Sequence, residues 1–152
     1  MRQKTIEEYI EIIYVLQKKR GRARTMDIAS KKGVKPPSIT EILKKMKAEG
    51  FVEYETYAGV TLTPSGEKIA RKLMKKHKIL ADFFEIIGIN RELAEVDGCE
   101  IEHHISADTI KQLEKFIKFL SSSDKKWIKD FEEFCKDGKR EKGRKMGKKE
   151  MI

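Results

Sequence analysis

The segment from residue 34 to residue 50, VKPPSITEILKKMKAEG, constrains the fold of this chain more than any other part of the sequence. The residue before a proline avoids helical backbone angles, whereas proline itself suits the first turn of a helix. Pro36 and Pro37 therefore mark the start of a helix, which Gly50 ends. Apolar side chains recur at helical spacing along it and predict one face in contact with a core. These side chains are Ile39, Ile42, Leu43 and Met46.

Two short strands and another helix follow this segment. Residues 51–55 and 60–62 are rich in β-branched and aromatic side chains, and a glycine lies between them, so we expect a two-stranded ribbon. Thr63 and Pro64 then supply a helix cap and a first-turn proline. The helix that they begin extends to about Ile87.

Apolar residues at helical spacing predict further helices on both sides of this region. The predicted helices cover residues 5–19, 25–32, 91–104, 106–120 and about 127–134. We expect Thr5 and Thr25 to cap the first two of them. From residue 136 onwards the chain is basic and poor in apolar residues, which predicts a disordered tail. The fold class is therefore mainly α, with an N-terminal winged helix-turn-helix followed by a helical domain.

The composition narrows the class of partner. The 34 Lys and Arg residues outnumber the 25 Asp and Glu residues, which gives a formal net charge of +9. Such a surplus attracts polyanions, either nucleic acid or an anionic membrane surface. The sequence lacks the long apolar run of a transmembrane helix and the apolar core of a signal peptide. Because its two cysteines make a poor disulfide framework, we expect a cytoplasmic protein without a membrane partner.

The order helix, turn, helix, ribbon and helix is that of a winged helix-turn-helix, whose second short helix enters the major groove of double-stranded DNA. Ser38 and Thr40 would donate hydrogen bonds to bases or phosphates, and Glu41 would accept one from a cytosine amine. Lysines nearby would supply positive charge for phosphates. The predicted DNA-binding residues are Lys35, Pro37, Ser38, Thr40, Glu41, Lys44 and Lys45. The alternative is an ordinary amphipathic helix with a solvated lysine face.

A cysteine, a glutamate and a histidine share one face of the helix predicted over residues 91–104. Cys99, Glu102 and His103 lie at i, i+3 and i+4, and Glu95 lies four residues before the cysteine. A thiolate, a carboxylate and an imidazole that converge are ligands for a transition metal ion. The apolar residues on other faces, which we expect to hold this helix to the core, are Leu93, Val96 and Ile101. The alternative for the cysteine is a small buried side chain.

Three more side chains are candidate metal ligands, but each also has an ordinary structural explanation. His77 lies at the edge of an apolar stripe, where a single histidine is more often structural than a ligand. Glu8 and Glu11 would normally be surface carboxylates of a helix. Because Ile12 and Val15 lie beside these carboxylates, the first helix is apolar on two sides and we expect it to contact two bodies.

Four stretches of the sequence resemble the diphtheria-toxin-repressor family of iron- and manganese-dependent transcriptional regulators, most closely its short, manganese-transport-regulator branch. They are IEEYIEIIYVL, VKPPSITEILKKMKAEGFVEYE, GVTLTPSGEKIARKLMKKHKILADFF and CEIEHHIS. The resemblance covers residues 5 to about 120. It implies a homodimer, not an enzyme, that represses metal-uptake genes when a divalent metal activates it for operator binding. It also implies a DNA-binding domain over residues 1–70, a helical metal-binding and dimerisation domain over 71–135, and a basic tail over 136–152.

The resemblance also implies a set of metal ligands. Carried over position by position, they are Glu8, Glu11, His77, Cys99, Glu102 and His103. Cys99 stands where manganese-selective members usually have Glu, and where iron-type members have Cys. The ancillary site of iron-type members is altered, since its Glu and His correspond here to Ala81 and Glu95. Because a thiolate favours softer ions, we expect Fe(II) as cofactor, with Mn(II) next and Zn, Co or Ni as substitutes in vitro.

Three rival hypotheses stay open on the sequence. In the first, the chain is a winged-helix regulator that responds to an organic ligand or to none, and its His and Cys side chains only pack in the interior. Alternatively it is a metalloenzyme, although the sequence has no HExxH motif. The third alternative is a structural zinc site with constitutive DNA binding, in which case mild chelation would leave operator binding intact.

Overall fold

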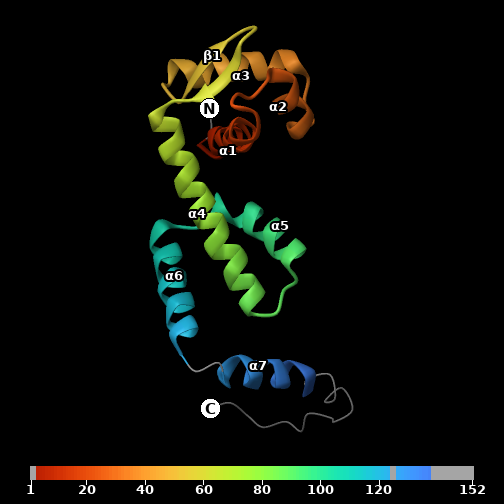
Figure 1. Ribbon diagram of the computed structural model, residues 1–152, viewed down its shortest axis with the longest axis vertical. Helices are drawn as coiled ribbons and strands as arrows, with labels where there is room; N and C mark the ends of the chain where they lie inside the picture. The colour runs from red at the N-terminus through yellow and green to blue at the C-terminus, as the bar shows by residue number, and fades with distance from the viewer. Residues whose placement is uncertain (1–2, 124–125, 138–152) are drawn as a thin grey trace, which may run out of the picture.

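A computed structural model describes residues 3–123 and 126–137. The winged helix-turn-helix lies at one end of the molecule, and a long helix leads from it to the remaining helices (Figure 1). The elements in chain order are α1 (Gln3–Arg20), α2 (Thr25–Lys32), α3 (Pro36–Ala48), β1 (Val52–Glu55), β2 (Gly59–Leu62), α4 (Pro64–Ile86), α5 (Arg91–Glu102), α6 (Ala107–Ser122) and α7 (Lys126–Asp137). The mainly helical fold and the predicted order of elements are confirmed.

The N-terminal part has one hydrophobic core. Strands β1 and β2 pair antiparallel, with Val52 opposite Leu62, and cover α1 and α3. Side chains from α1, α2, α3 and both strands meet in this core and are fully buried. They include Ile10, Ile13, Ile28, Ile39, Leu43, Met46, Val52 and Val60. The apolar face predicted for the helix after Pro36 therefore packs as expected, with Ile42 only partly buried against the same core.

Helix α4 connects this core to the second half of the chain. Thr63 caps its start, since the threonine hydroxyl accepts a hydrogen bond of 3.1 Å from the Gly66 amide. Helices α1, α5 and α6 all pack against α4. Gly98 of α5 lies so close that a Cβ atom there would be 3.6 Å from the backbone of His77. The small residue allows the two helices to approach closely, which positions α5 side chains beside those of α4.

The structure corrects three sequence expectations. Thr5 is not a cap, because α1 already begins at Gln3, and Thr25 is the first residue of α2 rather than its cap. The apolar residues Leu93, Val96 and Ile101 do not hold α5 to the core, since all three are exposed. Buried Ala94 and Gly98 form the inner face of α5 instead. Short side chains suffice there because the α4 backbone is so close.

The C-terminal half has a smaller core of its own, in which Ile79 and Leu80 of α4 meet Ile110 of α6. Among the described residues, no helix is both long and apolar enough to cross a membrane. The basic tail predicted over residues 136–152 lies outside the described residues from residue 138 onwards.

Candidate metal centre

Three helices bring the predicted metal ligands to the place where the two halves of the molecule meet. Glu8 and Glu11 project from α1, and His77 projects from α4. Cys99 and Glu102 lie on the last turn of α5, which starts with an Asn90 cap, and His103 ends that helix. The i, i+3, i+4 spacing therefore places its three side chains on one helical turn, beside the small-residue contact between α4 and α5.

The centre of this region is a cluster of Glu11, His77 and Glu102. One ligand atom from each of these side chains lies within 4.8 Å of the others. Glu102 is 0% exposed, and within the described part of the chain neither of its carboxylate oxygens has a hydrogen-bond partner. His77 Nδ1 lies 3.2 Å from Glu102 Oε2, but it too lacks a hydrogen bond of proper geometry there. Burial of unpartnered polar atoms is costly, so these atoms fit a bound cation.

The crowding of these groups raises two pKa values. Burial, together with the negative charge of Glu102, raises the pKa of Glu11 to about 7. Contact with the carboxylates of Glu102 and Glu95 raises the pKa of His77 to about 9, against the opposing effect of burial. Protons on these groups therefore offset part of the clustered negative charge.

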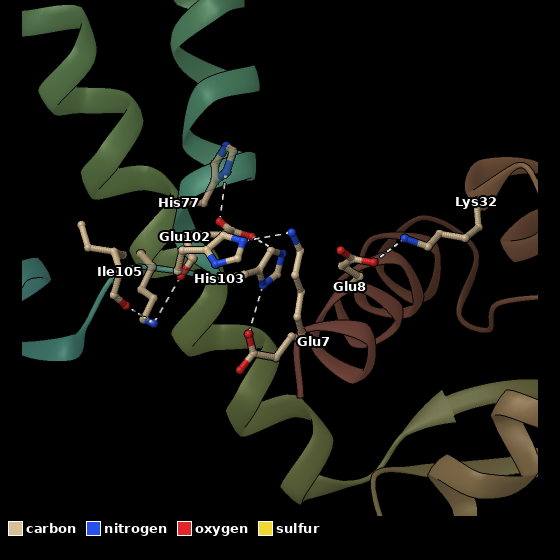
Figure 2. A network of polar contacts seen from close by, with 10 residues as sticks. Glu7, Glu8, Lys32, His77, Glu102, His103 and Ile105 are labelled. Atoms are coloured by element: carbon tan, nitrogen blue, oxygen red, sulfur yellow. Dashed lines mark hydrogen bonds and ion pairs between the residues drawn. The ribbon is translucent and has the colours of Figure 1, made fainter. Parts of the chain in front are cut away.

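His103 is held between two carboxylates from different helices (Figure 2). Its side chain is only 3% exposed, and Nδ1 lies 3.0 Å from Glu7 Oε2 of α1. Its other ring nitrogen, Nε2, lies 3.5 Å from Glu102 Oε1. Glu7 was not among the predicted site residues, although it precedes Glu11 by four positions and so shares its helical face. A carboxylate on Nδ1 orients the ring and leaves Nε2 facing the cluster.

Glu8 and Cys99 border the cluster but are not part of its centre. Glu8 forms an ion pair with Lys32 of α2 and extends toward that helix (Figure 2). Lys32 is a second residue that the sequence interpretation missed, because nothing in its spacing along α2 relates it to the residues of α1. Cys99 is exposed at the surface, but its thiol is partly buried, which raises the pKa of that thiol, as do the carboxylates around it, Glu11 first. Glu8, Glu11, Cys99 and His103 all line one pocket of about 250 Å³.

Glu95 contacts the other nitrogen of His77. His77 Nε2 lies 2.5 Å from Glu95 Oε2, and Arg91 donates a hydrogen bond of 2.9 Å to Glu95 Oε1. These contacts hold the pKa of Glu95 below its ordinary value, chiefly through His77. The glutamate therefore lies on the predicted face, where it orients the imidazole.

The donor set fits a divalent transition metal ion. Carboxylates, imidazoles and a thiol that gives up its proton to a metal suit Fe(II), Mn(II) or Zn(II). Glu11, His77 and Glu102 form the group that could hold an ion, and Glu8, Cys99 and His103 lie beside it along the pocket. Donors on α1 and donors on α4 and α5 face one another across the junction between the two halves.

The residues predicted to contact DNA lie on the outer face of α3. Ser38 and Pro37 are exposed at its start, and the lysines at positions 35, 44 and 45 are exposed as well. Thr40 is only partly exposed, and its hydroxyl donates a hydrogen bond of 3.4 Å to the Pro36 carbonyl. Glu41 forms an exposed ion pair of 3.2 Å with Lys44. The face is polar and free of the core, as a reading helix requires.

Comparisons with known proteins agree on one family. The family profile "Iron dependent repressor, N-terminal DNA binding domain" matches residues 1–60, and "Iron dependent repressor, metal binding and dimerisation domain" matches residues 63–126. The HTH-type transcriptional regulator MntR of Bacillus pumilus is 37% identical over 124 residues, which make up 82% of this chain and 86% of that protein.

Solved structures give the same fold. The manganese regulator SloR matches with a TM-score of 0.64 and 28% identity over 75% of this chain and 54% of its own. IdeR of T. acidophilum matches with a TM-score of 0.65 and 28% identity over 76% of this chain and 55% of its own. The chain thus spans about half the length of these two proteins.

Proposed function

This chain belongs to the family of iron-dependent repressors, and we propose that a divalent metal ion activates it by tying its first helix to the α4–α5 unit. Family membership makes it a metal-activated, DNA-binding transcriptional repressor.

One observation carries the proposal: Glu11, His77 and Glu102 converge from three different helices, with the buried carboxylate of Glu102 lacking any hydrogen-bond partner in the described structure. The ligand set that we propose is Glu8, Glu11, His77, Cys99, Glu102 and His103. When bound, the metal supplies positive charge that neutralises the clustered carboxylates. Glu8 and Glu11 belong to the helix that packs in the DNA-binding core, so neutralisation fixes that core relative to α4 and α5.

The protein then binds DNA as a homodimer. Exposed apolar side chains on α5 and α6 support dimerisation, because large exposed apolar residues mark interaction surfaces. They are Leu93, Val96, Ile101, Phe116 and Phe119. In a dimer, two copies of α3 must match half-sites spaced by a helical turn of double-stranded DNA or multiples of it. Fixing each DNA-binding unit on its α4 fixes this spacing, which is how metal raises affinity for the operator.

The contacts on DNA fall to the outer face of α3. We assign base contacts to Ser38, Thr40 and Glu41, and phosphate contacts to the lysines at positions 35, 44 and 45. Pro37 lies in the first turn of α3 and helps to fix where this helix begins. The regulated genes that fit a metal-activated repressor are those for uptake of the same metal.

For the physiological metal we propose Fe(II) first and Mn(II) second, with Zn, Co or Ni binding in vitro. The thiolate of Cys99 favours the softer ion. Mn(II) has support from SloR, a manganese regulator similar to this chain. The carboxylate-rich inner cluster is compatible with both ions.

A gel-shift or anisotropy titration tests the proposal. DNA binding of the purified protein is compared with Fe(II), with Mn(II), and with a chelator, and the metal content is measured in parallel. We expect tight binding with metal and at least a tenfold loss with chelator, equivalent to about 1.4 kcal/mol of coupling. Equal binding in all three conditions would favour a structural metal site or a regulator without metal control.

A further inference from the structure

A second basic surface lies beside the ribbon of β1, β2 and the turn between them (residues 52–62), which we call the wing, and apart from α3. The side chains of Arg20, Arg22 and Arg24 line a pocket of about 450 Å³ together with Ala58 of the turn between the strands. These arginines come from the end of α1 and from the connection to α2.

The connection is fixed in place by the wing. Ala23 and Val60 form an antiparallel bridge, with N–O distances of 3.0 and 2.9 Å. Gly59 makes this approach possible, because a Cβ atom there would lie 2.7 Å from the Ala23 carbonyl oxygen, and its φ is +95°. Ala23 is fully buried, and neighbouring side chains of an extended segment alternate. Arg22 and Arg24 therefore share the outward face.

The charge of this surface is poorly compensated. Arg20 donates a hydrogen bond of 2.9 Å to Asp27, and Arg22 donates one of 3.4 Å to the Ala58 carbonyl. Within residues 3–123 and 126–137, neither Arg22 nor Arg24 pairs with a carboxylate. Guanidinium groups that share a pocket repel each other unless an anion joins them, and they fit phosphate oxygens in a bidentate manner.

The position of these arginines beside the wing indicates which anion they bind. Tyr57, at the tip of the turn next to Ala58, is fully exposed, so the ribbon projects from the molecule where a winged helix-turn-helix meets the DNA backbone. We propose that Arg22 and Arg24, supported by Arg20, form a clamp for backbone phosphates outside the groove that α3 enters. This clamp rests on the proposed DNA-binding function and adds affinity without reading sequence.

The test compares salt dependence. Full-length, Mn(II)-loaded protein is titrated onto two duplexes of equal length, one selected from a random library with this protein and one of unrelated sequence. Each phosphate contact contributes about 0.9 to the slope of log K against log salt. With one copy of each arginine per subunit, Arg24→Gln is expected to lower the slope by about 2 per dimer, and to weaken both duplexes by the same factor. Arg22→Gln is expected to act in the same way.

Two further variants make the result decisive. Lys111→Gln removes the same charge from α6, where the lysine pairs with exposed Asp108, and is expected to leave the slope unchanged. Arg24→Lys keeps the charge and is expected to retain most of the slope. If Arg24→Gln and Arg22→Gln gave the same salt slope as Lys111→Gln, the proposed clamp would be wrong. A loss of affinity for the selected duplex alone would also contradict it. Metal dependence of the wild type, measured separately, reports on the proposed function, so the two can fail independently.

Discussion

Lys32 is expected to compete with metal for Glu8, and its removal should tighten metal binding. The Lys32 ammonium pairs with the Glu8 carboxylate, which extends from α1 toward α2 (Figure 2). If Glu8 is a metal ligand, this ion pair must open before the carboxylate can turn to the cluster. Lys32→Gln removes the competitor and leaves Glu8 available.

The size of the effect follows from the burial of the pair. The two side chains are 30% and 27% exposed, so solvent still screens their attraction. Exposed pairs contribute about 0.2–1 kcal/mol, and a half-buried pair such as this falls near the upper end, at about 1 kcal/mol. Since 1.4 kcal/mol corresponds to a factor of ten, the variant should bind metal about fivefold more tightly.

Calorimetric titration of Mn(II) into the apo protein measures this change. Lys31→Gln is the matched control, because Lys31 lines the same pocket and carries the same charge but forms no ion pair within the described part of the chain. The general loss of positive charge near the site then cancels. Equal affinities for Lys32→Gln and Lys31→Gln would refute the competition, and weaker binding by Lys32→Gln would give Lys32 the opposite role.

Three further predictions concern the cluster itself. Glu102→Gln and His103→Ala should each abolish metal-stimulated DNA binding while leaving a folded dimer, which anisotropy and sedimentation measure; normal stimulation would remove both residues from the ligand set. Cys99→Glu should shift the ratio of Mn(II) to Fe(II) affinity toward Mn(II) by replacing a soft donor with a hard one, and an unchanged ratio would count against the thiolate. Because the pKa of His77 is raised to about 9 and that of Glu11 to about 7, both hold protons that metal must displace, so Mn(II) affinity should rise between about pH 6 and pH 8 with release of protons. Titration in buffers of different ionisation heat measures that release, and an affinity independent of pH would contradict it.

Local rules predicted most of the winged helix-turn-helix. Pro36 and Pro37 begin α3, and Thr63 caps α4, because proline geometry and hydroxyl capping act within a few residues of the chain. The apolar stripe of α3 packs inward for the same reason, since helical periodicity alone decides which side faces a core. These features need no knowledge of the tertiary fold.

Tertiary packing decided what the sequence could not predict. Apolar Leu93 and Val96 suggested a buried face on α5, but the close contact at Gly98 buries the small residues and leaves the larger ones exposed. An apolar stripe by itself does not distinguish contact with the chain's own core from contact with a second copy. Likewise, the pairing of Glu8 with Lys32 joins two helices, and no rule of spacing relates them.

The most direct test of the metal centre is anomalous scattering from crystals of the Mn(II)-loaded protein. We expect an anomalous peak bounded by the carboxylates of Glu8 and Glu11 from α1 on one side and by Glu102 and His103 on the other. A peak there would show that one ion is bound both by α1, which packs in the DNA-binding core, and by the α4–α5 unit. A peak bounded by α4 and α5 side chains alone, with both α1 carboxylates turned to solvent, would contradict the proposed activation.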